Sequence, residues 1–381
     1  MSSVTLALAR HGPVRGTLGG RSFRPATWLF AVADGNATDL MLSCEYGSQL
    51  YAGRLDIATE LSGTTNSTFN AAEWAQVTTT SASIADHWHL FEHGHHYLSY
   101  HDTTSPGTEI YVLRLEPDLS DVSSPVEVCA VSTTPQSSPG VCGPYPTVTS
   151  AAVTSSECML SLNDHFMFAS ALGVYLVVCN QRSTQNELVV LELDEDLLAG
   201  SDVGPYAFTG TRGDGTAYPM EAGGSALAAP AGGAGRFSLV TQSSFDTATG
   251  TDSDLYCGET DATWVQPASP TRTISEVDSL GNDRFLMFPT LARFENGWSV
   301  VTYVRYSTLG AGFQGGDVVR QLLDEMGVPS GPAEVLVTAT ATRVAARPHV
   351  ALWGDYLLTT WDEQVSTGTR CYMRVDRVTL S

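Results

Sequence analysis

Residues 86–119 read DHWHLFEHGHHYLSYHDTTSPGTEIYVLRLEPDL, and they decide the fold because the chain repeats them. A shift of 78 residues, without a gap, brings this stretch onto residues 164–197, DHFMFASALGVYLVVCNQRSTQNELVVLELDEDL. Eleven of the 34 aligned positions are identical, and a further six keep an apolar residue opposite an apolar residue. Internal similarity at a fixed spacing is typical of a repeat architecture.

One strand-like segment of this repeat recurs along the whole chain. It consists of an apolar residue, alternating residues rich in β-branched and aromatic side chains, and a final Asp or Glu. Alternation with a period of two predicts a β-strand, and the acidic residue predicts the turn that follows it. The six copies are LYAGRLD (50–56), IYVLRLE (110–116), LVVLELD (188–194), LYCGETD (255–261), VVRQLLD (318–324) and RCYMRVD (370–376).

Two apolar runs precede each copy and a weaker run follows it, so each unit has four predicted strands. In the first unit the preceding runs are residues 28–32 and 40–43, and in the sixth unit they are 349–353 and 356–361. Six units of four antiparallel strands predict an all-β chain folded as a six-bladed β-propeller. The sixth unit ends close to Ser381, so residues 4–9 are expected to supply its missing outer strand and close the ring.

The units also resemble a widespread repeat of secreted bacterial β-propeller proteins. The resemblance rests on residues 50–56, 110–116 and 323–327. It implies the propeller fold and an extracellular or periplasmic location, and it names no functional family. We expect one domain over residues 1–381, with blades near 16–80, 81–150, 151–215, 216–272, 273–340 and 341–381, the last completed by 4–10.

Composition limits the partners. The chain has 41 acidic and 19 basic residues and a net charge of −22, which disfavours nucleic acid and anionic membrane surfaces. No apolar run approaches 18 residues, so we expect no membrane insertion. The N-terminus lacks the basic region of a signal peptide. Oligomeric state is left open.

Seven cysteines are present, and no C-x-x-C motif occurs. Cys129 and Cys142 flank a loop rich in Ser and Pro, and we expect a disulfide between them. The total is odd, so at least one thiol is free or pairs with another chain.

Histidines mark the predicted mouth of the central channel. They begin the first strands of the second, third and sixth units as His87, His165 and His349. Thr290 takes the matching place in the fifth unit and Ala26 in the first. Imidazoles at equivalent places in a ring converge, so they are candidate ligands for a divalent metal such as Zn, Cu or Ca. The alternative is that each histidine hydrogen-bonds the neighbouring blade.

Other polar residues fall on the same predicted face, in the loops between second and third strands. Asp102, Asp362 and Glu363 of these loops are the candidate catalytic residues. The candidate ligand-binding residues are His101 and Arg182 of the same loops, together with Trp88, Trp353 and Trp361 of the first and second strands. Five arginines also lie near this mouth without an assigned role: Arg24, Arg182, Arg284, Arg305 and Arg347. The remaining histidines near the second unit, His93, His95 and His96, are predicted to lie in a solvated turn.

Two function classes follow. The first is a propeller that binds a small molecule or a glycan through aromatic and acidic side chains. The second is a metal-dependent enzyme, a hydrolase or a lyase, with three histidine ligands and an open position. Repeated histidines favour the enzyme, and the lack of a clear general base favours the binding protein.

Overall fold

The computed structural model describes residues 2–33, 38–78, 84–102, 108–131, 159–170, 173–181, 186–193, 199–207, 209–211, 217–219, 221–228, 236–243, 254–261, 271–276, 284–306, 316–340, 343–366 and 368–381. These residues form β-strands almost throughout, and the only helix among them is the five-residue α1 (Ile57–Leu61). None of the described helices is long and apolar enough to cross a membrane.

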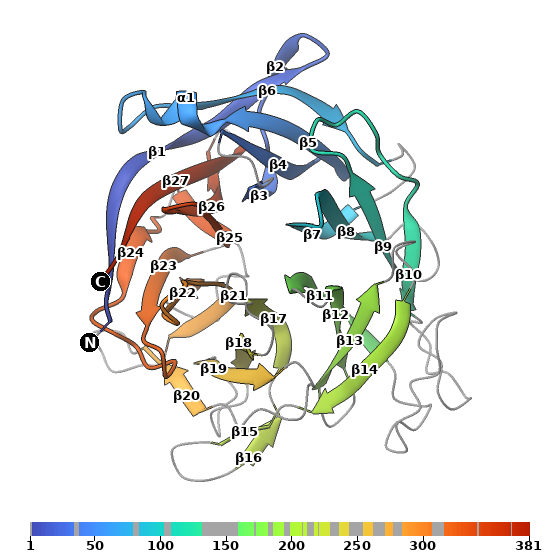
Figure 1. Ribbon diagram of the computed structural model, residues 1–381, viewed down its shortest axis with the longest axis vertical. Helices are drawn as coiled ribbons and strands as arrows, with labels where there is room; N and C mark the ends of the chain where they lie inside the picture. Colours follow the sequence, from blue (N-terminus) through green and yellow to red (C-terminus); the bar gives the residue numbers. More distant parts are fainter. Residues whose placement is uncertain are drawn as a thin grey trace.

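The sheets are arranged around a common centre, with the inner strand of each facing that centre (Figure 1). Three sheets have four strands each, and their hydrogen-bonded orders follow the chain: β10-β9-β8-β7, β11-β12-β13-β14 and β21-β22-β23-β24. A six-stranded sheet has the order β16-β15-β20-β19-β18-β17. A nine-stranded sheet has the order β25-β26-β27-β1-β6-β5-β4-β3, with β2 attached to β1. This radial arrangement of antiparallel sheets is that of a β-propeller.

The strand bounds are as follows. The shared nine-stranded sheet contains β1 (Val4–Leu18), β2 (Arg21–Phe23), β3 (Thr27–Ala33), β4 (Asp39–Tyr46), β5 (Gln49–Asp56), β6 (Phe69–Gln76), β25 (Arg343–Trp353), β26 (Tyr356–Val365) and β27 (Gly368–Leu380). The others are β7 (Ile84–Glu92), β8 (His95–Asp102), β9 (Thr108–Leu115), β10 (Val126–Val131), β11 (Met159–Ser170), β12 (Gly173–Gln181), β13 (Asn186–Leu193), β14 (Ala199–Ala207), β15 (Thr209–Thr211), β16 (Ala217–Pro219), β17 (Glu221–Ala228), β18 (Arg236–Ser243), β19 (Asp254–Asp261), β20 (Thr271–Ile274), β21 (Phe285–Arg293), β22 (Ser299–Tyr306), β23 (Asp317–Leu323) and β24 (Glu334–Val337).

The six recurring segments are confirmed as β-strands, namely β5, β9, β13, β19, β23 and β27. The prediction for the N-terminus is also confirmed. Residues Val4 to Pro13 of β1 pair antiparallel with β27, from Leu380 back to Tyr372. The second half of β1 then pairs parallel with β6, so one strand joins the last unit to the first. The two chain ends lie side by side at the edge of the ring (Figure 1).

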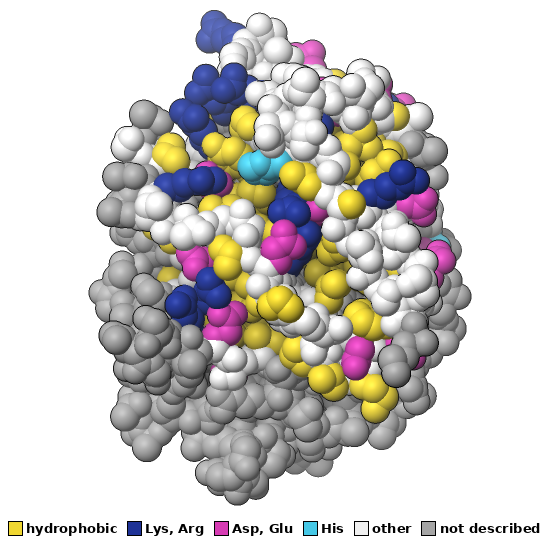
Figure 2. Space-filling model, turned by 90° about the vertical axis from the view of Figure 1, so that its left-hand side faces the viewer, with side chains coloured by type: hydrophobic (Ala, Val, Ile, Leu, Met, Phe, Trp, Pro, Cys, Tyr) yellow, Lys and Arg dark blue, Asp and Glu magenta, His cyan; other side chains and the backbone are white. Residues whose placement is uncertain are grey.

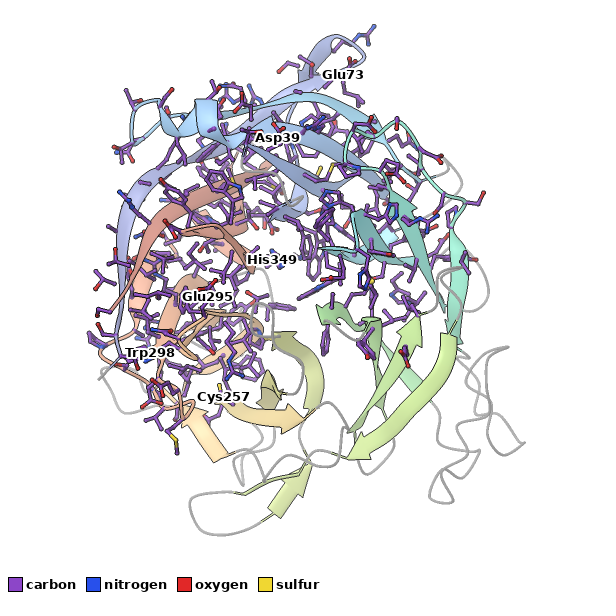
Figure 3. All side chains as sticks on the ribbon, viewed as in Figure 1. Asp39, Glu73, Cys257, Glu295, Trp298 and His349 are labelled. Carbon is purple, nitrogen blue, oxygen red and sulfur yellow. The ribbon has the colours of Figure 1, made fainter. Side chains whose placement is uncertain are left out.

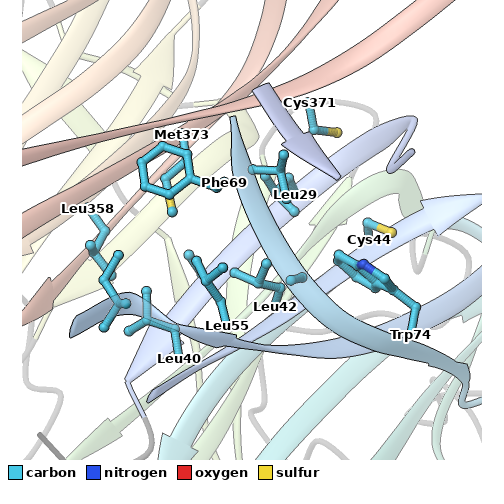
Figure 4. Packing of buried hydrophobic residues seen from close by; sticks show 14 of the residues in the cluster. Leu29, Leu40, Leu42, Cys44, Leu55, Phe69, Trp74, Leu358, Cys371 and Met373 are labelled. Atoms are coloured by element: carbon cyan, nitrogen blue, oxygen red, sulfur yellow. The ribbon is translucent and has the colours of Figure 1, made fainter. Parts of the chain in front are cut away.

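The core lies between neighbouring sheets. Its largest cluster contains Leu29, Leu42, Phe69 and Trp74 from the first unit, with Leu358 and Met373 from the last (Figure 4). All are buried, as the alternation of their strands requires. This cluster packs the last unit against the first, and therefore holds β3 and β25 in fixed positions beside the channel.

The outer side of the ring is a mixed surface. Over β1, β24 and β27, basic and acidic side chains lie next to one another among hydrophobic ones (Figure 2). Among the ion pairs of this region, Arg374 contacts Glu334 at 3.1 Å, and Arg320 contacts the buried Asp376 at 2.6 Å. The paired charges stabilise the contact between the fifth and sixth units.

Candidate functional site

A shift in strand register occurs within each of the six first strands that the structure describes. It lies between Thr27 and Phe30 in β3, Ile84 and His87 in β7, Leu160 and His165 in β11, Glu221 and Ala226 in β17, Met287 and Thr290 in β21, and Ala346 and His349 in β25. Such bulges turn side chains away from the regular alternation and are common beside functional sites. We call the face where first strands begin and second strands end the entry face.

In three of these strands the irregularity requires an unusual backbone. Trp28, Phe288 and Arg347 have φ values of 52°, 52° and 50°. Positive φ values are uncommon for residues other than glycine, and especially for bulky ones. They come from the first, fifth and sixth units, which are neighbours at the closure of the ring. Residues held in such conformations cluster at sites where the fold positions a functional side chain.

The register corrects one prediction. The residue of the first unit that matches His87, Thr290 and His349 is Phe30, not Ala26, because Phe30 is the first residue after the register shift. Ala26 precedes β3 altogether. The bulge interrupts the alternation of apolar and polar residues. The alternation therefore predicted only the part of β25 that follows the bulge, and it missed residues 343–348.

The three predicted histidines line the interior of the channel together with aromatic rings. The ring centroid of Phe30 lies 4.7 Å from that of His87 and 4.3 Å from that of His349. Trp88 lies 5.5 Å from His349 and 5.9 Å from Phe166. His349 faces the centre of the ring (Figure 3). The interior is therefore packed with aromatic rings at this level.

Two of the three predicted imidazoles, His87 and His165, hydrogen-bond a neighbouring sheet, as the alternative prediction stated, and His349 contacts the neighbouring unit through the Phe30 ring. Ser43 Oγ of β4 lies 3.0 Å from His87 Nε2 and 2.9 Å from His89 Nδ1. His89 Nε2 continues to His96 Nδ1 at 3.0 Å, and His165 bonds the backbone of Ser99 in β8. His96 is fully buried, so the prediction of a solvated turn is wrong for this residue, because its position in β8 points inward.

Burial keeps these imidazoles neutral. Loss of solvation lowers the pKa of His165 and of His349 to about 3. It lowers the pKa of His96 to about 3 and those of His87 and His89 well below 6.5. Neutral imidazole is the form that binds metals.

Within the part of the chain that the structure describes, no group of three or more His, Cys, Asp or Glu side chains converges to hold a metal ion. The Phe30 ring contacts both His87 and His349. The three-histidine metal site stays a prediction.

A different group of polar residues gathers on the entry face, at the junction of the fifth, sixth and first units. Arg347 Nη1 lies 3.3 Å from Asp362 Oδ2, and the Arg347 guanidinium lies over the Trp28 ring at 4.9 Å. Trp28 also contacts Phe288 edge to face at 6.5 Å. Glu45 pairs with Thr27 in the ladder between β3 and β4. We call Trp28, Glu45, Tyr306, Arg347 and Asp362 the entry-face cluster.

Both carboxyl groups of this cluster have a perturbed pKa. Burial raises the pKa of Glu45 to about 7, against the opposing effects of Arg347 and of a hydrogen bond with Thr27. Burial likewise raises the pKa of Asp362 to about 7, against Arg347 and the backbone amides of Asp362 and Trp28. Burial raises the pKa of Tyr306 to about 12. Carboxyl groups poised near neutral pH are typical of acid–base sites.

Asp362 is thus the one predicted catalytic residue that the structure brings into this cluster. Glu363 instead accepts hydrogen bonds within its own sheet, from Arg343 of the paired strand β25 at 2.7 and 2.5 Å and from Trp361 Nε1 at 2.9 Å. Asp102 lies at the end of β8 on the same face, in the second unit.

The predicted ligand-binding residues are dispersed. Trp361 is 0% exposed and stacks with Tyr372, so its ring is part of the core and does not reach a ligand. Trp353 lies at the far end of β25, stacked on Tyr356 across the hairpin, on the opposite face. His101 is buried at the end of β8 and Trp88 is half-buried in the channel. Arg182 and the predicted disulfide, through Cys142, lie outside the described residues. Among the described cysteines, Cys44 and Cys371 are buried free thiols.

Glu45 and Trp28 were missed by the sequence analysis, and Arg347 was placed near the mouth without a role. No motif surrounds Glu45, and it is adjacent to the tyrosine that ends β4. A usable signal was the position of each residue in its unit, since Glu45 and Asp362 both lie near the end of a second strand.

No family model matches the chain, and no curated protein sequence matches it significantly. Solved structures share its fold. An α-L-arabinanase from Penicillium chrysogenum, complexed with arabinobiose, has a TM-score of 0.51 at 12% identity over 97% of this chain and 98% of its own. An α-L-arabinofuranosidase from Fusarium graminearum has a TM-score of 0.52 at 12% identity over 92% of both chains.

A sialidase from Trypanosoma rangeli has a TM-score of 0.52 at 8% identity, covering 98% of this chain and 59% of its own. At such identities the likeness establishes the β-propeller fold alone.

Proposed function

We propose that the protein binds a glycan at the entry-face cluster. The observation that carries this proposal is the joint presence of an indole, a guanidinium and two carboxyl groups at one end of the channel, with Arg347 between Trp28 and Asp362. An aromatic ring supplies a flat apolar surface for a sugar ring, and charged groups form strong hydrogen bonds with hydroxyl groups.

The fold supports the same class of ligand. The three structures described above are named for enzymes that act on arabinose-containing or sialic-acid-containing glycans. Sites on such scaffolds form where loops and strand ends converge, and the entry-face cluster occupies a place of this kind.

Binding to a panel of soluble polysaccharides, followed by affinity electrophoresis and calorimetry, tests the proposal. We expect Trp28→Ala and Arg347→Ala each to weaken binding at least tenfold. Trp353→Ala is the matched control, because it removes an indole from the opposite face. Equal affinity of wild type and both entry-face variants would show that any glycan binds elsewhere, and the absence of binding to every polysaccharide would refute a glycan ligand.

We further propose that the ring has six blades within one domain. The nine-stranded sheet then comprises two blades, β3 to β6 and β25 to β27 with β1, joined through β1 and β6. Blade boundaries near residues 80, 150, 215, 272 and 340 complete this proposal. A crystal structure with a different number of blades would overturn it.

The metal-dependent enzyme is the second candidate, with His87, His165 and His349 as ligands. Burial lowers the pKa of His87, and the nearby imidazoles of His165 and His349 lower it further; this proximity of the three imidazoles is the observation in its favour. Elemental analysis of the purified protein decides it: about one equivalent of Zn or Cu that is lost in the triple His→Ala variant supports the site. A wild-type protein that contains no metal after growth in metal-supplemented medium would refute the proposed metal site.

We also propose an extracellular or periplasmic location. It rests on the resemblance to secreted propeller repeats and on the glycan-active proteins that share the fold. Fractionation of the source cells tests it, and recovery of the protein only with cytoplasmic markers would contradict it.

A further inference from the structure

The two carboxyl groups of the entry-face cluster differ in exposure. Asp362 is only 4% exposed, and its Oδ1 has no hydrogen-bond partner in the protein. Glu45, from the neighbouring first unit, is half-buried and reaches solvent. A buried carboxylate oxygen without a protein partner is rare and calls for a solvent or ligand partner. The cluster therefore offers one carboxyl group at the surface and one unused oxygen beneath it.

The cluster also contains two carboxyl groups and one guanidinium. Arg347 is the guanidinium that acts on both Glu45 and Asp362, so a single proton makes the group neutral. A desolvated site favours that neutral state. Asp362 has the direct contact with Arg347, at 3.3 Å, which favours its ionised form, so we assign the shared proton to Glu45.

We propose that this pair hydrolyses glycosidic bonds, an activity that rests on the glycan binding proposed above. Glu45 donates its proton to the glycosidic oxygen as the bond from that oxygen to the anomeric carbon breaks, and the bonding electrons stay on the oxygen. A water molecule adds to the anomeric carbon and releases a proton to Asp362 Oδ1. The two sugar products together gain the atoms of one water, and proton exchange with solvent restores Glu45. One acidic and one ionised carboxyl group are the usual requirement for this reaction.

Arg347 and Trp28 have supporting roles in this reaction. The guanidinium keeps Asp362 ionised, and Trp28 holds Arg347 in place from the opposite side. The backbone amide of Trp28 also faces the Asp362 carboxylate, so the bulge of β3 helps to position Asp362, the proposed base. Such fixed surroundings reduce the reorganisation needed when the charge moves.

The charge of the molecule selects the substrate class. The chain carries a net charge of −22, which repels uronates and other acidic sugars. The substrate is thus a neutral polysaccharide or oligosaccharide.

The test measures release of reducing ends from neutral polysaccharides, such as arabinan, xylan and β-glucan, with polygalacturonate as the acidic comparison. We expect cleavage of a neutral substrate only. We expect Glu45→Gln to lower kcat on that substrate at least 100-fold with its affinity retained. The matched control is Asp355→Asn, which removes a carboxylate from the β25–β26 turn on the opposite face and leaves activity unchanged.

A second substrate identifies the role of Glu45. An aryl glycoside with a leaving group of low pKa needs no proton donor, so Glu45→Gln should retain most of the wild-type rate on it, whereas Asp362→Asn should be impaired on both substrates. Loss of both activities in Glu45→Gln with normal circular dichroism would show that Glu45 is not the acid.

The outcomes separate the two proposals. A wild-type protein that binds a neutral glycan and releases no reducing ends overturns hydrolysis and leaves glycan binding intact. Absence of binding to every glycan overturns both. Cleavage of polygalacturonate at the rate of the neutral substrates overturns the assignment of substrate class.

Discussion

The channel holds two polar groups that differ in how they are built. The interior group consists of His87, His165 and His349, which recur at equivalent places of three units and bond or contact the neighbouring sheet. The entry-face cluster consists of residues that occur once. A residue that recurs at one place of a repeat serves the contact that every unit makes, namely packing against the next unit. Residues that break the repeat are the better candidates for function.

The two groups also have opposite electrostatic behaviour. Burial lowers the pKa of the interior imidazoles and raises the pKa of the two entry-face carboxyl groups. Both shifts favour the neutral form, because charge is costly away from water. The two groups therefore respond with opposite sign to a change of pH, which makes them separable by experiment.

The largest expected effect is in the interior. Phe30→Ala removes a ring that is 2% exposed and contacts two imidazoles and Trp88. We expect a loss of about 3–5 kcal/mol in the free energy of unfolding, as for other buried phenylalanines. Trp28→Ala, two residues away on the entry face, should cost about 1 kcal/mol or less, because it also removes a bulky side chain from a strained backbone. Chemical denaturation measures both, and equal losses would erase the distinction between the two groups.

The next effect concerns the hydrogen bonds of the interior group. Ser43→Ala leaves His87 Nε2 and His89 Nδ1 buried without their common partner. An unsatisfied buried polar group costs about 1–3 kcal/mol, so the variant should unfold at a lower denaturant concentration and bind glycans as the wild type does. Ser120→Ala, an exposed serine in a turn, is the control. Weaker glycan binding by Ser43→Ala would indicate that the interior group belongs to the site.

Acidification should separate the groups by sign. Below pH 6.5 the unfolded chain binds protons that the buried imidazoles refuse down to about pH 3, so stability falls as the pH falls through this window. The carboxyl groups, with folded pKa values near 7, bind protons first in the folded state and oppose that fall between about pH 7 and 4. Five buried imidazoles outweigh two carboxyl groups, so the wild type should lose stability from pH 6.5 to 4.5.

The Glu45→Gln and Asp362→Asn double variant sharpens this prediction. It removes the two carboxyl groups whose protonation in the folded state opposes the loss of stability. The stability of the variant should therefore fall more steeply on acidification, by up to about 1 kcal/mol per pH unit. Denaturation curves at several pH values provide the slopes. A double variant with a shallower slope than wild type would mean that these carboxyl groups are ionised throughout the range.

The smallest effect is a change in a single pKa. Thr27→Val removes the hydroxyl that hydrogen-bonds the Glu45 carboxyl group and lowers its pKa. The pKa of Glu45 should then rise further above about 7, by less than one unit, since burial remains the dominant cause. Carboxyl carbon NMR titration measures it, and Asp56, exposed at the start of α1, is an internal reference. A fall in the pKa of Glu45 would contradict the prediction, because it would show that the Thr27 hydroxyl does not stabilise the ionised carboxyl group.

Much of the fold could be predicted from local pattern. The third strands are regular, so their alternation locates all six of them, and the closure by β1 follows from the missing strand of the last unit. The first strands were harder. Each predicted start fell at or after a bulge, as in β25, where His349 marks the register shift and Arg347 lies before it. Periodicity cannot detect residues on the irregular side of a bulge.

The candidate site shows the same limit. Asp362 was recognised because an acidic pair ends the last strong apolar run, but its neighbour Glu363 has the same local pattern and forms an ion pair with Arg343. Only their side of the strand distinguishes the two residues. Glu45 could not be associated with Asp362 at all, since 317 positions separate them and only the closure of the ring brings the first and sixth units together.

The sequence by itself determined that this chain is a ring of repeated antiparallel sheets, because hydrophobic alternation and its repetition are local properties that any strand must satisfy. It also determined the acidic character that disfavours polyanionic partners. The tertiary structure alone decided that the repeated histidines pack against aromatic rings, and that Glu45, Arg347 and Asp362 share one face. Burial and the distance between charges set the pKa of each group, and both depend on residues from different units that meet only when the ring closes.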